Sequence, residues 1–303
     1  MKILLTGGFG YLGKRFIETF SNSYDFVIYA KKDSALKHRK YGFPNNIVIE
    51  EGSIEDEKIV NVIKNHKPDV VIHLAAITGL TRCEENPSET FKINVFGTHN
   101  VVKSCIESGS RLIFASSFEV YGKTQKYECD EDDTLNPVNT YAITKMLGEE
   151  IVKLAGRNHD LNYTILRISN VYGPDYSRGI NTMIKSAIKE NMISVNGANR
   201  FRNFLYVDDA VQLINLVIND KRITKDVFNI GSTDTLILKE LAEKISHLLK
   251  SYLRIEYRPE LEIEANYRPN LKKLMSLGYA AKTPLDEGLE KTVKWYLEED
   301  HRI

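Results

Sequence analysis

A glycine-rich turn follows directly on the first apolar segment of the chain. Residues 2–6 read Lys-Ile-Leu-Leu-Thr, and glycines stand at positions 7, 8, 10 and 13 before an amphipathic segment begins. Glycine permits a tight turn, lets a pyrophosphate approach the backbone, and lets a helix pack closely on a strand. The helix that follows offers free backbone N–H groups and the positive end of its dipole. A strand, a glycine turn and a helix in this order predict a dinucleotide-binding site.

The rest of the first half alternates short apolar runs with amphipathic segments. This alternation predicts parallel strands joined by crossover helices, and hence an α/β fold with a Rossmann-type, doubly wound parallel sheet. The predicted strands are 2–6, 26–30, 47–49, 70–74, 112–115 and 163–168, and the predicted helices are 11–20, 55–65, 87–108 and 138–156.

The alternation loosens after Asn170, where helices are predicted at 177–190, 208–219, 239–250 and 285–299. We therefore predict a dinucleotide-binding Rossmann domain over residues 1–169, with a return segment over about 203–230. Residues 170–202 and 231–303 are predicted to form a smaller, mixed α/β lobe that binds the substrate.

Charge and cysteine content exclude several classes of protein. Lys+Arg and Asp+Glu both number 41, so the chain lacks the basic excess of a nucleic-acid binder. No apolar run approaches the roughly 20 residues of a membrane span, and the N-terminus does not resemble a signal peptide. Three widely spaced cysteines, Cys83, Cys105 and Cys129, indicate a reducing compartment, so we expect a cytoplasmic protein. Neither CxxC nor HExxH occurs, and no metal site is predicted.

The end of the second predicted strand bears on the choice of cofactor. NAD sites place Asp or Glu there to bind the ribose 2′-hydroxyl. Here the strand ends in Ala30, and Lys31 and Lys32 follow. Two ammonium groups favour the 2′-phosphate of NADP, so NADP is the predicted cofactor. NAD is the alternative, because Asp33 in a shifted loop could supply the acid.

A tyrosine and a lysine four residues apart form the candidate catalytic pair. Tyr141 and Lys145 share one face of the predicted helix 138–156, where a nearby cation is expected to lower the tyrosine pKa from about 10. Tyr141 could then serve as a general acid and base. Ser117 follows the predicted strand 112–115, and the carboxyl ends of such strands are where open α/β sheets bind ligands.

These motifs together resemble the extended short-chain dehydrogenase/reductases, the NAD-dependent epimerase/dehydratase family, over nearly the whole chain. The matching segments are 6–13, 73–76, 94–98, 116–122, 170–174, 202–209, 229–232, 277–279 and 287–295, with Tyr141 and Lys145 between them. The resemblance implies that Tyr141 exchanges a proton with a sugar hydroxyl or carbonyl, that Ser117 binds the same oxygen, and that Lys145 holds the nicotinamide ribose.

The remaining site residues follow from the same motifs. The predicted cofactor-binding residues are Gly7, Phe9, Gly10, Tyr11, Leu12, Gly13, Lys31, Lys32, Ser53, Ile54, Leu74, Ala75, Ala76 and Asn94, besides Tyr141 and Lys145. The predicted substrate-binding residues are Thr78, Glu119, Asn170, Asn181 and Arg202. The resemblance implies that Asn170, Asn181 and Arg202 hold a nucleotide diphosphate. His73 follows a buried strand, and we predict a structural role for it.

Glu119 has two interpretations. It matches a carboxylate that nucleotide-sugar decarboxylases and some 4,6-dehydratases use, or it caps or pairs locally. Dehydratases that rely on an Asp-Glu pair are poorly matched, because Phe118 occupies the Asp position.

The resemblance and the two lysines predict an NADPH-dependent 4-ketoreductase that finishes a deoxysugar nucleotide. The alternative is a nucleotide-sugar 4-epimerase, or a dehydratase or decarboxylase, with tightly bound NAD. A non-enzymatic NADP-sensing regulator is a third, more remote hypothesis. The expected partners are a nucleotide-diphosphate sugar and a second copy of the chain, which would form a homodimer through helices 87–108 and 138–156; no nucleic acid or membrane is expected.

Overall fold

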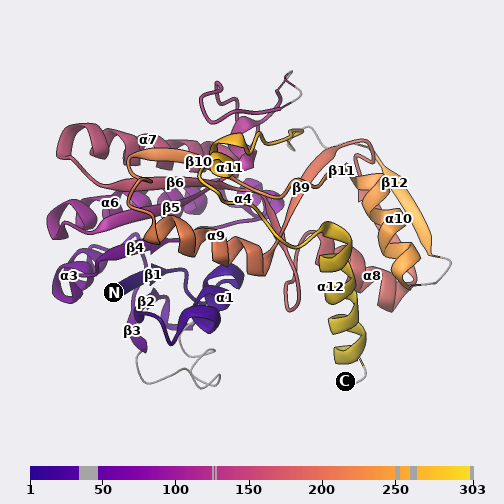
Figure 1. The fold of residues 1–303 in the computed structure, drawn as a ribbon, viewed down its shortest axis with the longest axis horizontal. Helices are drawn as coiled ribbons and strands as arrows, with labels where there is room; N and C mark the ends of the chain where they lie inside the picture. The colour runs from indigo at the N-terminus through magenta and orange to yellow at the C-terminus, as the bar shows by residue number, and fades with distance from the viewer. Residues whose placement is uncertain (34–46, 125, 127, 250–252, 260–264, 301–303) are drawn as a thin grey trace.

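A computed structural model of the protein describes residues 1–33, 47–124, 126, 128–249, 253–259 and 265–300. Its centre is a sheet of seven strands in the order β10-β6-β5-β4-β1-β2-β3, and every neighbouring pair is parallel (Figure 1). The doubly wound α/β fold predicted from the sequence is confirmed. The strands are β1 Lys2–Thr6, β2 Asp25–Ala30, β3 Ile47–Glu51, β4 Val70–His73, β5 Arg111–Ser117, β6 Tyr163–Ile168 and β10 Asp226–Ile230.

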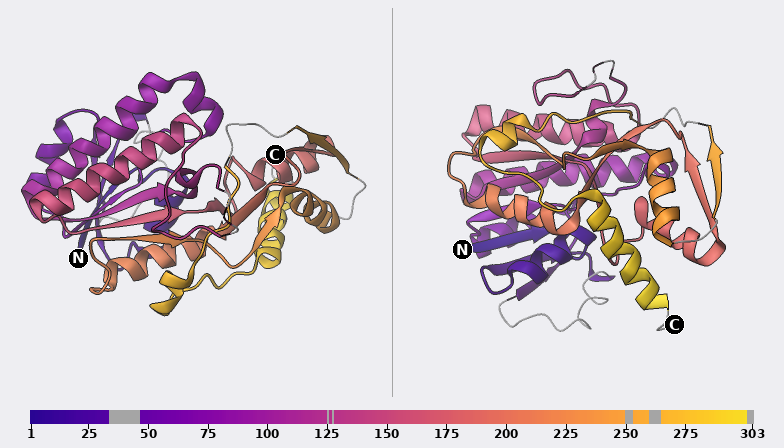
Figure 2. Two further views of the ribbon diagram at one scale, coloured as in Figure 1. Left: turned by 90° about the horizontal axis from the view of Figure 1, so that it is seen from above. Right: turned by 45° about the vertical axis from the view of Figure 1, so that its right-hand side comes forward.

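Helices cover both faces of this sheet because successive side chains of each buried strand point to opposite faces. Ile3 and Leu5 of β1 lie in one core with residues of α1 and α9, and Leu4 lies in a second core with residues of α3, α6 and α7. Figure 2 shows helices on both faces of the sheet. These helices are α1 Tyr11–Phe20, α3 Lys58–His66, α6 Gly97–Ser108, α7 Thr140–His159 and α9 Val207–Asn219.

A smaller set of elements lies at one end of the sheet and has its own core (Figure 1). A three-stranded sheet has the order β11-β9-β7, and β12 pairs with β8 in parallel. Helices α8, α10 and α12 contribute most of the buried apolar side chains. The bounds are β7 Asn170–Tyr172, α8 Ile180–Glu190, β8 Met192–Asn196, β9 Phe201–Tyr206, β11 Thr235–Ile237, α10 Leu238–Leu249, β12 Arg254–Arg258 and α12 Leu285–Asp300.

The structure departs from the sequence-based expectation at several places. The predicted helix 87–108 is divided into α5 Pro87–Phe91, a π-helical turn Lys92–Phe96 and α6. Two short helices, α4 Leu80–Glu85 and α11 Lys272–Ser276, were not predicted. Leu274 of α11 lies in the core beneath the seven-stranded sheet, although its segment was predicted to join the smaller lobe. Within the described residues, no helix is long and apolar enough to cross a membrane.

Candidate active site

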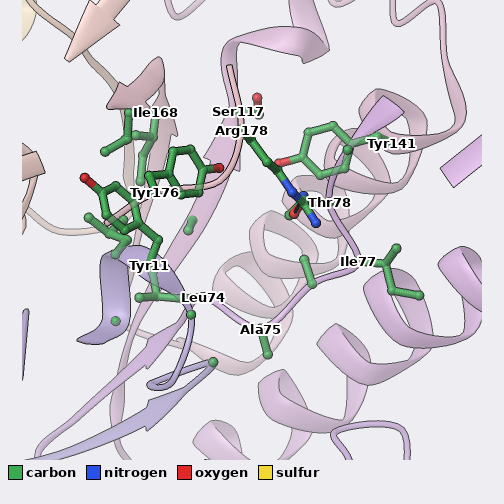
Figure 3. A pocket seen from close by; sticks show the side chains of 18 of the residues that line it. Tyr11, Leu74, Ala75, Ile77, Thr78, Ser117, Tyr141, Ile168, Tyr176 and Arg178 are labelled. Carbon is green, nitrogen blue, oxygen red and sulfur yellow. Dashed lines mark hydrogen bonds between the residues drawn. The ribbon is translucent and has the colours of Figure 1, made fainter. Parts of the chain in front are cut away.

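One cavity of about 1180 Å³ runs along the carboxyl ends of the central strands and into the smaller set of elements (Figure 3). Most of the residues predicted from the sequence lie on its wall. They are Gly7, Phe9, Gly10, Tyr11, Leu12, Gly13, Lys31, Ser53, Ile54, Leu74, Ala75, Ala76, Thr78, Ser117, Glu119, Tyr141, Lys145, Asn170 and Arg202. Lys32 instead lines a small adjoining hollow with Lys31 and Ser53.

The glycine turn is shaped by close backbone contacts at one end of the cavity. Gly7 has φ +72°, and a Cβ atom there would lie 2.7 Å from the Ala75 nitrogen. A Cβ atom at Gly13 would lie 2.5 Å from the Gly7 carbonyl oxygen. Helix α1 begins at Tyr11 without a side-chain cap, so its first N–H groups are available to a ligand in the cavity. This cradle fits the pyrophosphate of a dinucleotide.

Charges of both signs lie near the end of β2. Lys31 Nζ is 3.7 Å from a carboxylate oxygen of Glu55, and Glu55 also accepts a hydrogen bond from the Ser53 hydroxyl. Lys58, which the sequence did not single out, lines the small hollow beside Lys31 and Lys32. The negative charge of Glu55 therefore offsets part of the positive charge of Lys31, one of the two lysines from which NADP was predicted.

A buried polar network holds the loop after β4. His73 accepts or donates hydrogen bonds with Thr6 at 2.7 Å and Thr98 at 2.9 Å, and burial lowers its pKa to about 3. Asn94 Oδ1 accepts from the Ile77 N–H at 2.7 Å, and its Nδ2 donates to the Ile77 carbonyl. The structure places Asn94 behind the cavity wall, not on it, because both ends of its amide are engaged by the loop. His73 and Asn94 are thus both held by hydrogen bonds within the protein and do not line the cavity, and the binding of cofactor by Asn94 stays a prediction.

Ser117, Tyr141 and Lys145 converge on the cavity from β5 and α7. Asn139 caps α7 by accepting from the Ala142 N–H at 2.7 Å, which fixes the first turn that carries Tyr141. Lys145 is 4% exposed, donates to the Ala115 carbonyl at 2.8 Å, and has a pKa lowered to about 8 by burial.

The Tyr141 pKa differs from the sequence-based expectation. Burial raises it above its ordinary value, and a hydrogen bond with Ser117 only partly offsets this effect. The expected lowering by Lys145 is not found because the Lys145 ammonium is directed at the Ala115 carbonyl.

Glu119 is a buried carboxylate in the same cavity, with an exposed fraction of 8%. Asn139 Nδ2 donates to it at 3.4 Å and the Tyr267 hydroxyl at 3.5 Å, both long contacts. Burial raises the pKa of Tyr267, and the negative charge of Glu119 raises it further. The same charge also raises the pKa of Tyr141. Tyr267 was missed from the sequence because it lies in an irregular segment far along the chain.

The predicted diphosphate-binding residues separate into two groups. Asn170 and Arg202 line the cavity; Asn170 donates to the Asn203 carbonyl at 3.1 Å, and Arg202 donates to the Phe201 carbonyl at 3.0 Å. Asn181 does not line it, because its buried amide donates inward to the Gly173 carbonyl at 2.6 Å. The structure therefore places Asn181 off the cavity wall, and its role in binding substrate stays a prediction.

The segment 174–179 between β7 and α8, called here the β7–α8 segment, borders the cavity. Asp175 pairs with Lys14 at 2.9 Å, and Tyr176 stacks on Tyr11 with ring centroids 4.2 Å apart (Figure 3). Arg178 donates to the Thr78 hydroxyl. These contacts were missed because the segment has no periodic pattern and its partners are remote in sequence.

A buried ion pair supports β5 and α7, the elements that carry Ser117, Tyr141 and Lys145. Glu149, one turn after Lys145 on α7, accepts from Arg167 Nε at 3.0 Å and Nη2 at 2.8 Å. The Ser116 hydroxyl also donates to Glu149, at 2.6 Å. Arg167 is 1% exposed and Glu149 is fully buried, so the pair joins α7, β5 and β6 inside the protein.

Comparison with known proteins agrees with this geometry. A model of the "NAD dependent epimerase/dehydratase family" matches residues 3–231. A putative UDP-glucose 4-epimerase of Methanocaldococcus jannaschii is 31% identical, and the match covers 97% of each chain. The dTDP-D-glucose 4,6-dehydratase of Mus musculus is 30% identical, over 99% of this chain and 90% of the relative. The crystal structure of a UDP-glucose 4-epimerase from Thermotoga maritima with UDP-glucose has a TM-score of 0.88 and 26% identity, and 99% of each chain is covered.

Proposed function

The chain belongs to the NAD-dependent epimerase/dehydratase family, and on that premise we propose that it is a nucleotide-sugar 4-epimerase that keeps NAD bound through its reaction. The observation that carries the proposal is the single cavity, which joins the glycine turn to Ser117, Tyr141 and Lys145. Similarity over nearly full length to proteins named as UDP-glucose 4-epimerases supports this reaction over the 4-ketoreductase. The ketoreductase remains a competing prediction.

NAD is the cofactor we propose. The Glu55 carboxylate beside Lys31 weakens the argument for a 2′-phosphate, and the family model itself describes NAD-dependent enzymes. NADP stays the competing prediction, because Lys31, Lys32 and Lys58 line one hollow.

In this proposal, the chain's own residues move and hold a proton. A bound nicotinamide would supply the acceptor and donor of hydride. Tyr141 Oη takes the proton of the sugar C4 hydroxyl as that carbon is oxidised, and returns a proton when it is reduced on the other face. Ser117 forms a hydrogen bond with the same oxygen. When substrate and cofactor bind, the Lys145 ammonium would turn from the Ala115 carbonyl toward Tyr141 and favour its phenolate form.

The test is turnover without added cofactor. The purified protein is incubated with UDP-glucose, and the sugar products are followed by proton NMR while the copurifying nucleotide is identified by mass spectrometry. We expect UDP-galactose to form with no net consumption of NADH or NADPH. Reaction only with stoichiometric NADPH would replace the epimerase by the ketoreductase, and failure to bind any nucleotide sugar would favour the regulatory hypothesis.

Glu119 supports decarboxylation of a nucleotide-linked uronic acid as a second candidate. Its buried carboxylate lines the same cavity as Ser117, Tyr141 and Lys145. Nucleotide-sugar decarboxylases of the family that this chain resembles have a carboxylate at the matching position. Oxidation at C4 of a uronic acid produces a β-keto acid, which can lose CO₂. Incubation with UDP-glucuronic acid distinguishes the two reactions: a pentose product and released CO₂ indicate decarboxylation, and UDP-galacturonic acid indicates epimerisation.

We also propose that the protein is a homodimer. Phe91 and Phe96 on the segment 87–108, and Leu154 on α7, are large apolar side chains exposed by 39%, 52% and 50%. Large apolar side chains exposed on neighbouring helices are typical of an interface. Light scattering should give twice the mass of 34.6 kDa, and Phe96→Glu should lower it to that of one chain.

A further inference from the structure

Tyr176 of the β7–α8 segment presents a hydroxyl group to the cavity. Its side chain is half-buried and lines the cavity wall, and no group among the described residues forms a hydrogen bond with this hydroxyl. Polar groups that are largely removed from water normally have a hydrogen-bond partner. A ligand that fills the cavity would supply that partner.

The Tyr176 ring and the backbone that carries it are both held in place. The ring stacks on the Tyr11 ring of α1, with centroids 4.2 Å apart and an angle of 17° between the planes. The Tyr176 carbonyl accepts a hydrogen bond from the Tyr296 hydroxyl of α12, and Asn181 Nδ2 donates to the same hydroxyl at 3.0 Å. Because the side chain is already ordered, little conformational entropy is lost when a ligand contacts it.

The hydroxyl groups of the two stacked tyrosines point in different directions. The Tyr11 hydroxyl is buried and packs against the backbone at Gly173, where an added Cβ atom would lie 2.8 Å from it. The Tyr176 hydroxyl points toward that of Tyr141 from the opposite wall of the cavity (Figure 3). Burial is the main cause of the raised Tyr141 pKa, and Tyr176 contributes to it, which agrees with this placement. Tyr176 is thus the member of the stacked pair that would meet a ligand held at Tyr141.

We propose that the Tyr176 hydroxyl binds a hydroxyl group of the sugar close to the reacting carbon, on C3 or on C6. The inference rests on the proposed function, because it assumes that Tyr141 and Ser117 meet the oxygen on C4. A phenol hydroxyl is uncharged and both donates and accepts hydrogen bonds, which suits a sugar hydroxyl better than a phosphate or a carboxylate. A site that holds such a group discriminates against a sugar that lacks it, so Tyr176 is a specificity-determining residue.

Three sugars and one conservative substitution test the contact. The protein, with the nucleotide that copurifies, is supplied with UDP-glucose, UDP-3-deoxyglucose or UDP-6-deoxyglucose; kcat/KM is measured by proton NMR and Kd by titration calorimetry. Tyr176→Phe keeps the stacked ring and removes only the hydroxyl. It should lower kcat/KM and raise Kd for UDP-glucose by about 3- to 10-fold, the effect of one neutral hydrogen bond. For the deoxy sugar that lacks the contacted hydroxyl, the same substitution should change both constants by less than about twofold.

Tyr206→Phe is the matched control. Tyr206 is a buried tyrosine at the end of β9 that does not line the described cavity, so the substitution removes a hydroxyl that no cavity ligand reaches. It should leave kcat/KM and Kd for all three sugars within about twofold of the wild type. Thermal unfolding of both variants establishes that each is folded under the conditions of the assay.

The outcomes separate the contact from the reaction. Equal effects of Tyr176→Phe on all three sugars, or no effect on UDP-glucose, overturn the Tyr176 assignment and leave the proposed function standing. Loss of the copurifying nucleotide from Tyr176→Phe assigns the hydroxyl to the cofactor and also overturns the inference. The expected dependence of Kd on the sugar, without epimerisation by the wild type, supports the contact and contradicts the proposed epimerase. Failure of every sugar to bind the folded wild type overturns both.

Discussion

Glu149→Gln should be among the most destabilising conservative changes in this protein. The substitution keeps the size of the side chain and removes its charge. Arg167 then remains fully buried without its counter-charge, and its Nε and Nη2 lose bonds of 3.0 and 2.8 Å to a carboxylate. Breaking one side of a buried ion pair typically costs about 3–5 kcal/mol.

The size of the effect on Tm follows from the length of the chain. The entropy of unfolding is about 2.1 cal/mol/K per residue, which gives about 0.6 kcal/mol/K for 303 residues. A loss of about 3–5 kcal/mol therefore corresponds to a decrease in Tm of about 5–8 °C. Arg167 lowers the pKa of Glu149, so the stabilisation is present above the ordinary carboxyl pKa and is lost as the pH falls through the lowered value.

Differential scanning calorimetry at pH 7 and at pH 4 tests this reasoning. Glu150→Gln is the matched control, because Glu150 is the adjacent residue on α7, is exposed, and pairs with Lys153 at 3.0 Å on the surface. The control should change Tm by less than about 1 °C. A Glu149→Gln protein that unfolds within 1 °C of the wild type at pH 7 would show that the buried pair does not stabilise the fold.

Three further predictions concern the cavity. Tyr141→Phe should lower kcat by about 10²- to 10⁴-fold while the nucleotide content measured by mass spectrometry stays the same; near-full turnover would exclude Tyr141 as the proton carrier. Lys145→Met should raise Tm at pH 7 by about 5 °C, because burial lowers the Lys145 pKa from 10.5 to about 8 and the charged form therefore opposes folding most strongly below pH 8. That difference should shrink between pH 8 and pH 10 in calorimetry, as the folded wild type loses the proton, and a constant difference would contradict the lowered pKa. Gly13→Ala should release the copurifying nucleotide, since the new Cβ would lie 2.5 Å from the Gly7 carbonyl oxygen; full nucleotide content would show that the turn is not the cradle.

The central sheet could be predicted well from the sequence because its signals are local. Strands 2–6 and 163–168 agree with β1 and β6 at both ends, since each is a short apolar run between polar segments. β8 and β12 were not predicted. Their pairing joins residues 192–196 to 254–258, and β12 carries arginines at both ends and exposed side chains, so nothing in either segment alone indicates a strand.

In the candidate site, as in the fold, residues in local motifs could be predicted and contacts between remote segments could not. The glycine turn, Ser117, Tyr141 and Lys145 carry recognisable spacing, and the structure brings them to one cavity. Asn94 and Asn181 were assigned to ligands, but their amides bond to backbone groups that the sequence does not reveal as neighbours. The raised pKa of Tyr141 also escaped prediction, because the extent of burial is a property of the assembled fold.

The β7–α8 segment contacts the protein at both ends of the cavity. It contacts α1 through Asp175 and Tyr176, and it contacts the loop after β4 through Arg178. A dinucleotide that moved Asp175 and Tyr176, and with them Arg178, would change the affinity for the sugar ligand, and by reciprocity the sugar would change the affinity for the dinucleotide by the same factor. A substitution among these six residues that alters cofactor retention is therefore expected to alter the affinity for the sugar ligand as well.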